Sequence, residues 1–329
     1  MTRTQTITVG TIVFLATVFL LMVVGVLPGL KQARPAPFSL ELWSFDDEDS
    51  AWQDIIQSFE KENSHISVRY TRVNKENFEA TLINRLAENT GPDIFMMKNA
   101  WLIAHRDKIY PLPQSTFRFS VNTFADTFVD VAGSDLISND GAIYGIPLYV
   151  DSLALFYNKD IFNASNIAVP PRTWDEVSQV SRALTQISPA GDITKSGIAL
   201  GSAKNITHAF EIISAMILQN GDPIVSRTHT VQMDKGSEDA LLFYTSFADR
   251  TKQNFTWSNL LENSLDAFAE EKTAMAIGLA YDISRMRAKN PHINIGVAPF
   301  PQLKNASKPA TYADYAFLAV SKLSRHRDD

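Results

Sequence analysis

The chain has 329 residues, no cysteine and a formal net charge of −6 at pH 7. Its 45% hydrophobic and 20% charged residues indicate a globular protein, long enough for two domains, rather than a disordered chain. The lack of cysteine excludes disulfides, thiolate metal sites and cysteine catalysis. The negative charge, with no Lys/Arg run after residue 38, argues against a nucleic-acid surface.

The first notable segment, residues 7–30, contains no charged residue and is rich in Val, Leu, Ile and Phe. About 20 such residues are enough to cross a bilayer as a helix, so we predict an uncleaved N-terminal membrane anchor. A cleaved signal peptide is the alternative, although its apolar core is usually about 7–15 residues long. A short linker with two prolines, residues 33–37, follows the segment.

Residues 38–97 alternate between strand and helix patterns. Strand patterns at 38–45, 66–70 and 93–97 are separated by two helix patterns, and each helix has an apolar face. The residues of these two faces, which we expect in the core, are Trp52, Ile55, Ile56 and Phe59, and then Phe78, Leu82 and Leu86. The order strand, helix, strand, helix, strand predicts a parallel sheet with right-handed crossovers.

Ligands of such sheets bind beyond the carboxyl ends of the strands. This rule nominates Phe45 and Asp46 after the first strand, and Lys98, Asn99 and Trp101 after the third. For Trp101, a core or lid aromatic is an equally good interpretation. The acids at 46–49 do not have the alternate spacing or the glycine of a calcium loop, so we interpret them as a solvated turn and helix start.

Catalytic and metal-binding motifs are missing from the sequence. The six histidines stand apart from one another, and no G-x-S-x-G, P-loop or G-x-G-x-x-G motif occurs. No pair of acids stands out as a glycosidase pair with two distinct environments. We therefore predict neither an enzyme nor a bound metal or cofactor.

The central stretch, residues 144–158, is apolar and aromatic apart from Asp151. A strand buried on both faces is suggested by Val150, Leu153, Leu155 and Phe156, and Pro147 marks its entry into a sheet. Asp151 is either a water-facing residue at the end of a strand or a ligand-facing carboxylate between two lobes. We favour the second interpretation and expect its side chain to face a cleft and to contribute little to the fold.

The second half of the chain again alternates between helix and strand patterns. A capping box begins a helix at Thr173, and apolar helices are predicted near 206–219 and 238–250. Strands are predicted at 273–278 and 293–298, and Tyr281 lies at the start of a short helix.

The central stretch resembles the maltose-binding-like branch of the extracellular solute-binding proteins of ABC importers. Those proteins carry the pattern Y-G-[IV]-P-x-x-x-[DE]-x-x-x-L-x-Y-N where the chain first crosses between two lobes. Further pieces of the resemblance follow in the family's order. They are Trp43, G-P-D-I at 91–94, P-x-T-W-D-E at 171–176, F-A-E-E-K-T-A-M-A-I-G at 268–278 and A-D-Y-A-F-L-A-V-S-K at 313–322.

The resemblance extends from about residue 38 to the end and implies a two-lobed α/β fold of the periplasmic-binding-protein type II. It divides the chain into an N-terminal segment, residues 1–37, a discontinuous first lobe, residues 38–147 and 311–329, and a second lobe, residues 148–310. Family members normally continue with further helices, so we expect the sequence to be truncated at its C-terminus. The resemblance also implies a body outside the cytoplasm, extracellular or periplasmic, which delivers a solute to ABC permease subunits.

The expected ligand is a sugar or oligosaccharide bound between the lobes. Sugars need aromatic platforms for their C–H faces and polar groups for their hydroxyls. The candidate platforms are Trp101, Tyr149, Tyr281 and Tyr315, and the candidate polar groups are Asp46, Asn99, Asp151 and Asp314, with Phe45 beside them. Several family members have Trp at the positions of Tyr281 and Tyr315. Monosaccharide, glycerol phosphate and polyamine remain alternatives to an oligosaccharide, and a membrane-tethered sensor or an anchored carbohydrate-active enzyme remain alternatives to an importer component.

Overall fold

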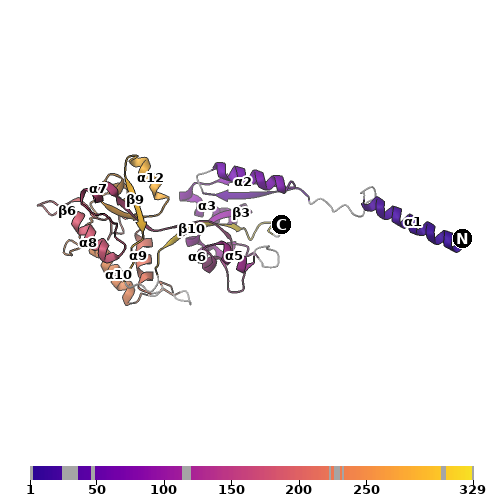
Figure 1. The fold of residues 1–329 in the computed structure, drawn as a ribbon. Helices are drawn as coiled ribbons and strands as arrows, with labels where there is room; N and C mark the ends of the chain where they lie inside the picture. Colours follow the sequence, from indigo (N-terminus) through magenta and orange to yellow (C-terminus); the bar gives the residue numbers. More distant parts are fainter. Residues whose placement is uncertain are drawn as a thin grey trace.

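Strand pairing separates the protein into two lobes, each built on its own sheet (Figure 1). The computed structural model describes residues 3–23, 36–45, 49–112, 120–221, 224–225, 230–231, 233–304 and 309–327. The first lobe contains a five-stranded sheet of order β2-β1-β3-β10-β4, and the second contains a three-stranded sheet of order β8-β5-β9. The predicted two-lobed α/β architecture is confirmed.

The first lobe is formed mainly by the N-terminal half of the body. Its elements are β1 (Phe38–Ser44), α2 (Asp49–Glu62), β2 (Ile66–Arg72), α3 (Lys75–Ala87), β3 (Ile94–Lys98), the 3₁₀ helix η1 (Asn99–Trp101), α4 (Leu102–His105), the 3₁₀ helix η2 (Arg106–Lys108), α5 (Val121–Thr127), α6 (Asp130–Leu136), β4 (Ile146–Ser152) and β10 (Ala313–Val320). Strand β1 pairs in parallel with β2 and β3, as predicted. Strand β10 returns from the far end of the sequence and runs antiparallel between β3 and β4.

The second lobe is formed by the chain between β4 and β10. Its elements are β5 (Ala154–Asn158), α7 (Lys159–Ala164), α8 (Trp174–Leu184), β6 (Gln186–Ile187), β7 (Ile193–Lys195), α9 (Ala209–Gln219), α10 (Lys235–Ser246), α11 (Ser264–Ala269), β8 (Met275–Gly278), α12 (Asp282–Lys289) and β9 (Ile295–Pro299). The predicted capping box begins α8: Thr173 Oγ1 accepts the N–H of Glu176, and the Glu176 carboxylate accepts the N–H of Thr173.

The apolar face of α3 is in the core of the first lobe as predicted, because Phe78, Leu82 and Leu86 are fully buried. The face of α2 is only partly buried. Trp52 is buried, whereas Ile55 is 60% exposed and Phe59 is 39% exposed, so the prediction that they are core residues is wrong. Helix α2 packs on β2 at the edge of the sheet, where no further strand or helix of the described chain covers its outer side.

The central stretch forms two strands in different sheets rather than one strand buried on both faces. Val150, on the edge strand β4, is 39% exposed. Residues 149–152 pair with β10 in the first lobe, so by strand pairing the chain leaves the first sheet at Leu153. Pro147 lacks an N–H and is tolerated because β4 is an edge strand.

Gly145 in this stretch is required by close packing. A Cβ at residue 145 would lie 2.4 Å from Cδ2 of Phe317 and 2.5 Å from the backbone oxygen of Leu318, both on β10. A side chain at this position would therefore push apart the two segments that connect the lobes.

The N-terminal helix α1 (Arg3–Val23) lies apart from both lobes (Figure 1). Within the described residues, no helix has the combined length and hydropathy required to cross a membrane. The structure therefore does not support the predicted membrane-spanning helix at residues 7–30, of which residues 24–30 lie outside the described part of the chain.

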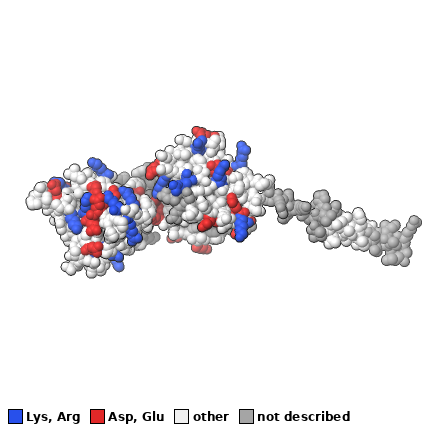
Figure 2. Space-filling view, turned by 90° about the horizontal axis from the view of Figure 1, so that it is seen from above, with Lys and Arg blue, Asp and Glu red and all other residues white. Residues whose placement is uncertain are grey.

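Charged side chains of both signs are mixed on the surface shown in Figure 2. On the second lobe, Lys272 and Lys289 flank Glu270, with N–O distances of 2.6 and 2.7 Å. Arg285 and Lys289 both contact Asp266. These basic residues of the second lobe are accordingly paired with acids.

Candidate functional site

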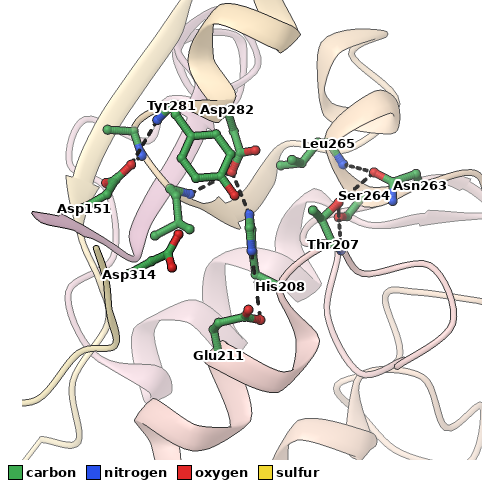
Figure 3. Close-up of polar contacts among 12 residues, drawn as sticks. Asp151, Thr207, His208, Glu211, Asn263, Ser264, Leu265, Tyr281, Asp282 and Asp314 are labelled. Carbon is green, nitrogen blue, oxygen red and sulfur yellow. Dashed lines mark hydrogen bonds and ion pairs between the residues drawn. The ribbon is translucent and has the colours of Figure 1, made fainter. Parts of the chain in front are cut away.

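The Asp151 carboxylate connects the crossover to the start of α12 (Figure 3). Its Oδ1 accepts the N–H of Ser152 at 2.8 Å and of Ala280 at 2.9 Å, and its Oδ2 accepts the N–H of Tyr281 at 3.1 Å. Ala280 and Tyr281 directly precede α12, and backbone N–H groups that have no partner in a helix or sheet need another acceptor. Asp151 therefore contributes to the fold, contrary to the prediction of a carboxylate with little structural role.

A buried histidine lies behind the same helix end. His208 Nε2 is 2.7 Å from Oδ2 of Asp282, which also accepts the N–H of Leu279 at 2.8 Å. The other ring nitrogen, Nδ1, is 4.0 Å from the carboxylate of Glu211 on α9. Both His208 and Asp282 are buried, so this pair fixes the start of α12 against the start of α9.

Tyr281 lies between Asp151 and His208 and is 47% exposed. Its ring contacts the His208 ring edge-to-face, with the centroids 6.2 Å apart. Among the described residues its hydroxyl has no hydrogen-bond partner. Partial burial raises the pKa of the Tyr281 phenol, and the nearby carboxylates of Asp282, Asp314, Glu211 and Asp151 raise that pKa further. Tyr281 is thus a fixed aromatic ring, open on part of its surface, in an acidic environment.

Asp314 forms an ion pair at the carboxyl end of β3. Nζ of Lys98 lies 2.9 and 3.0 Å from the two carboxylate oxygens of Asp314, and these side chains are 21% and 15% exposed. The Asn99 side chain bonds to the backbone of β10: Nδ2 donates to the oxygen of Ala313 at 3.0 Å, and Oδ1 accepts the N–H of Tyr315 at 3.3 Å. Asn99 therefore fixes the start of β10. Of Lys98, Asn99 and Asp314, it is Asp314 that lies near Tyr281.

The remaining predicted residues have different positions. Phe45 and Tyr315 are buried in the core of the first lobe, and the Tyr315 hydroxyl donates to Asp135 at 2.8 Å, so neither residue is an open platform. Trp101 is partly buried and stacks on Phe78, as the core or lid interpretation predicted. Tyr149 is 44% exposed on β4. The predicted residue Asp46 lies outside the described residues.

Three residues near Tyr281 were not among the predicted site residues: Lys75, His208 and Glu211. The spacing of His208 and Glu211 at the start of a predicted helix places both on one face, which is a local signal that the sequence contains. Lys75, on α3 of the first lobe, places its Nζ 4.9 Å from the centroid of the Tyr281 ring. Only the tertiary structure brings Lys75 to this position.

A cavity of about 620 Å³ lies beside the two segments that connect the lobes. It is lined by Ser152–Ala154, by Val297–Phe300 with Gln302, and by Pro309–Thr311. Neither Tyr281 nor Asp314 lines it. The cavity is therefore separate from the cluster around Tyr281, where aromatic and acidic groups of both lobes meet.

Comparison with known proteins points to one family. The model of the bacterial extracellular solute-binding protein family matches residues 43–329. The multiple sugar-binding protein of Streptococcus mutans is 24% identical over 296 residues, which cover 84% of this chain and 65% of that protein. Maltodextrin-binding protein MdxE of Bacillus subtilis is 24% identical over 285 residues, covering 83% of this chain and 62% of that protein. The chain thus spans less than two thirds of the length of these relatives.

Solved structures agree on the fold. The sugar-binding protein MalE from Xanthomonas citri superposes with a TM-score of 0.70 at 23% sequence identity, covering 88% of this chain and 72% of that chain. This similarity confirms the two-lobed architecture.

Proposed function

The chain belongs to the bacterial extracellular solute-binding protein family, and we propose that it binds a carbohydrate between its two lobes and delivers it to an ABC importer. The observation that carries this proposal is the cluster in Figure 3, where Asp314 of the first lobe and Glu211 of the second lobe lie near the partly exposed ring of Tyr281.

The groups of this cluster match the chemistry of a sugar. The ring of Tyr281 offers an apolar surface for the C–H face of a pyranose. Its hydroxyl, which has no hydrogen-bond partner among the described residues, can donate to or accept from a sugar hydroxyl. The carboxylates of Asp314 and Glu211 are acceptors for the hydroxyl hydrogens. Ligand sites commonly combine an apolar wall with a few convergent polar groups, and they often lie between domains.

Phe210, at the start of α9, offers a second exposed aromatic surface. It is 68% exposed and contacts the partly buried Tyr312 edge-to-face at 6.3 Å between the centroids. The carboxylates of Glu211 and Asp314 both act on the phenol of Tyr312, whose pKa is raised by burial first and then by these charges. Two aromatic surfaces that share the carboxylates of Glu211 and Asp314 favour a ligand of more than one sugar unit.

The charges of the cluster disfavour an anionic ligand. Asp314 is already paired with Lys98, Asp151 accepts three backbone hydrogen bonds, and Glu211 adds a further negative charge. We therefore rank a neutral carbohydrate above glycerol phosphate. A polyamine is the cationic alternative, and the acidic surroundings of Tyr281 make it the main competitor.

Delivery implies a body outside the cytoplasm and permease subunits as partners, as in the family. Binding without turnover is the expected behaviour, because solute-binding proteins release their ligand unchanged to the permease. Attachment to the membrane through residues 7–30 stays a prediction from the sequence.

The test is a thermal-shift screen of the full chain against mono- and oligosaccharides, glycerol 3-phosphate and spermidine. A ligand at 100 times its Kd stabilises the folded state by about 2.7 kcal/mol, which such a screen resolves. We expect the largest shift with an oligosaccharide. A shift with spermidine alone would replace the carbohydrate with a polyamine, and no shift with any compound would contradict the proposed function.

Calorimetric titration with the best carbohydrate then locates the site. Tyr281→Leu should lower the affinity by roughly tenfold, since an aromatic contact and its buried area together contribute about 1–2 kcal/mol. Leu260→Ala is the matched control, because Leu260 is 86% exposed on the second lobe and is not part of the cluster. Equal affinities of the Tyr281 and Leu260 variants would place the ligand elsewhere.

A further inference from the structure

The ammonium of Lys75, in the first lobe, contacts the aromatic ring of Tyr281, in the second lobe. Lys75 is the first residue of α3, which is anchored in the first lobe through Phe78. Its Nζ lies 4.9 Å from the ring centroid of Tyr281, which precedes α12, and α12 is anchored in the second lobe through Met286. An ammonium within about 6 Å of an aromatic centroid is attracted by the ring.

The position of Lys75 in its own helix makes this contact informative. A positive charge in the first turn of a helix is unfavourable, because the free N–H groups there carry partial positive charge. The side chain of the N-cap residue Asn74 accepts the N–H of Glu76 at 2.9 Å, so Lys75 is not needed as a cap. Within the described chain, Lys75 has no carboxylate at ion-pair distance, and its one close partner is the ring.

The surroundings of Tyr281 explain why the ammonium is stable there. Asp282, Asp314, Glu211 and Asp151 place negative charge around the ring, and they raise the pKa of its phenol after the larger effect of burial. The ring itself is fixed from behind, because Asp151 binds its backbone N–H and His208 lies against its edge. In this contact the Lys75 side chain is long and exposed and can change its conformation, whereas the Tyr281 ring is held in place.

We propose that Lys75 is a positioning residue of the interlobe site, whose ammonium on the Tyr281 ring holds the first lobe close to the second before a ligand arrives. This proposal rests on the proposed function, since Tyr281 is also the expected sugar platform. A sugar that stacks on the covered face of the ring displaces the ammonium, and the sugar then bridges the two lobes in its place. The contact is weak enough to be displaced, because a cation–π pair at an exposed site changes an equilibrium by only about two- to fivefold.

The experiment measures the distance between the lobes without ligand. Because the sequence has no cysteine, Glu88→Cys on the first lobe and Thr251→Cys on the second allow two spin labels to be attached specifically. Both residues are exposed and lie outside the cluster. Distance distributions from electron–electron double resonance are then compared between the doubly labelled protein and its variants at Lys75 and Tyr281.

We expect Lys75→Ala and Tyr281→Leu to shift the distribution towards longer distances, each lowering the ratio of close to open forms by about two- to fivefold. The double variant should show no larger shift than either single variant, because both remove the same contact. Lys75→Arg keeps the cation and Tyr281→Phe keeps the ring, so these two matched controls should retain the original distribution.

Two results would overturn the proposal. One is an unchanged distribution in Lys75→Ala. The other is a double variant whose shift equals the sum of the single shifts, which would mean that the two residues act independently. No ligand is present in this measurement, so its outcome is independent of the carbohydrate screen: failure of the screen rejects the proposed function, and failure here rejects only the role of Lys75.

Discussion

Asp151 Oδ2 accepts the backbone N–H of Tyr281 at 3.1 Å. Asp151 lies on β4, near the point where the chain leaves the first lobe, and it thereby holds the residue that precedes α12 of the second lobe. The aromatic ring of the candidate site therefore keeps its position through the same stretch of chain that connects the lobes.

The first prediction is that Asp151→Asn lowers the melting temperature of the ligand-free protein. Asparagine keeps one acceptor oxygen, but its NH2 group cannot accept a hydrogen bond, so at least one of the bonds from Ser152, Ala280 and Tyr281 is lost together with the charge. Loss of one hydrogen bond to a charged acceptor costs about 1.5–3 kcal/mol, or a few degrees for a protein of this size. Asp54→Asn, an exposed residue on α2, is the matched control and should leave the melting temperature unchanged. An unchanged melting temperature together with weaker sugar binding would contradict this prediction. It would show that Asp151 binds the ligand and contributes little to the fold.

The second prediction concerns the ion pair of Lys98 and Asp314, whose side chains are mostly buried. Lys98→Met leaves the Asp314 carboxylate without its partner and should destabilise the protein by about 3 kcal/mol or more. Adding Asp314→Leu removes the unpaired charge and should recover most of the stability, although sugar affinity should remain low. Urea unfolding of the single and double variants measures this, and equal stabilities of the two would show that the pair is not coupled.

The third prediction follows from close packing at Gly145. Gly145→Ala forces a Cβ to within 2.5 Å of β10 and should cost about 1–3 kcal/mol. The control is Gly133→Ala, in α6, where the nearest atom is 3.9 Å away and alanine should stabilise the helix by about 0.5–1 kcal/mol. Thermal unfolding should move the two variants in opposite directions, and a shift of the same sign would contradict the packing argument.

The fourth prediction concerns alkaline pH. Tyr244 is buried and donates its hydroxyl to the oxygen of Ser202 at 2.8 Å, and burial raises the pKa of its phenol, as it does for Tyr315. Below the usual tyrosine pKa of about 10, both phenols are protonated in the folded and unfolded states. As the pH rises above about 10, the unfolded phenols ionise while the folded ones keep their protons, so stability should fall.

Absorbance at 295 nm checks this prediction. At pH about 11, unfolding in urea should increase the tyrosinate signal, and Tyr244→Phe should lower that increase by the contribution of one tyrosine. An equal increase in the variant would show that Tyr244 ionises in the folded protein.

The fifth prediction concerns the N-terminal segment. If residues 7–30 anchor the protein, the full-length chain should stay with membranes after a carbonate wash. A soluble product that is about thirty residues shorter at its N-terminus would identify a cleaved signal peptide instead.

Much of the architecture could be predicted from the sequence, because its causes are local. The alternation of strand and helix patterns over residues 38–97 predicts the parallel arrangement of β1, β2 and β3. The capping box at Thr173 and the buried face of α3 follow from spacings of three or four residues. The central motif also has local causes: Gly145 allows close approach, and Asn158 caps α7 with its Oδ1. These structural roles explain why the motif identifies the fold better than it identifies a ligand.

The tertiary structure decided which polar and aromatic residues are available to a ligand. Tyr315 has the residue type of a platform, but β10 runs between two other strands and the ring is fully buried. Asp151 resembles a ligand-facing acid, but its oxygens are used by amides 129 and 130 residues away along the chain. Lys75 reaches Tyr281 because two separately folded lobes face each other there. Burial and hydrogen bonding depend on distances between segments far apart in sequence, and local spacing does not determine those distances.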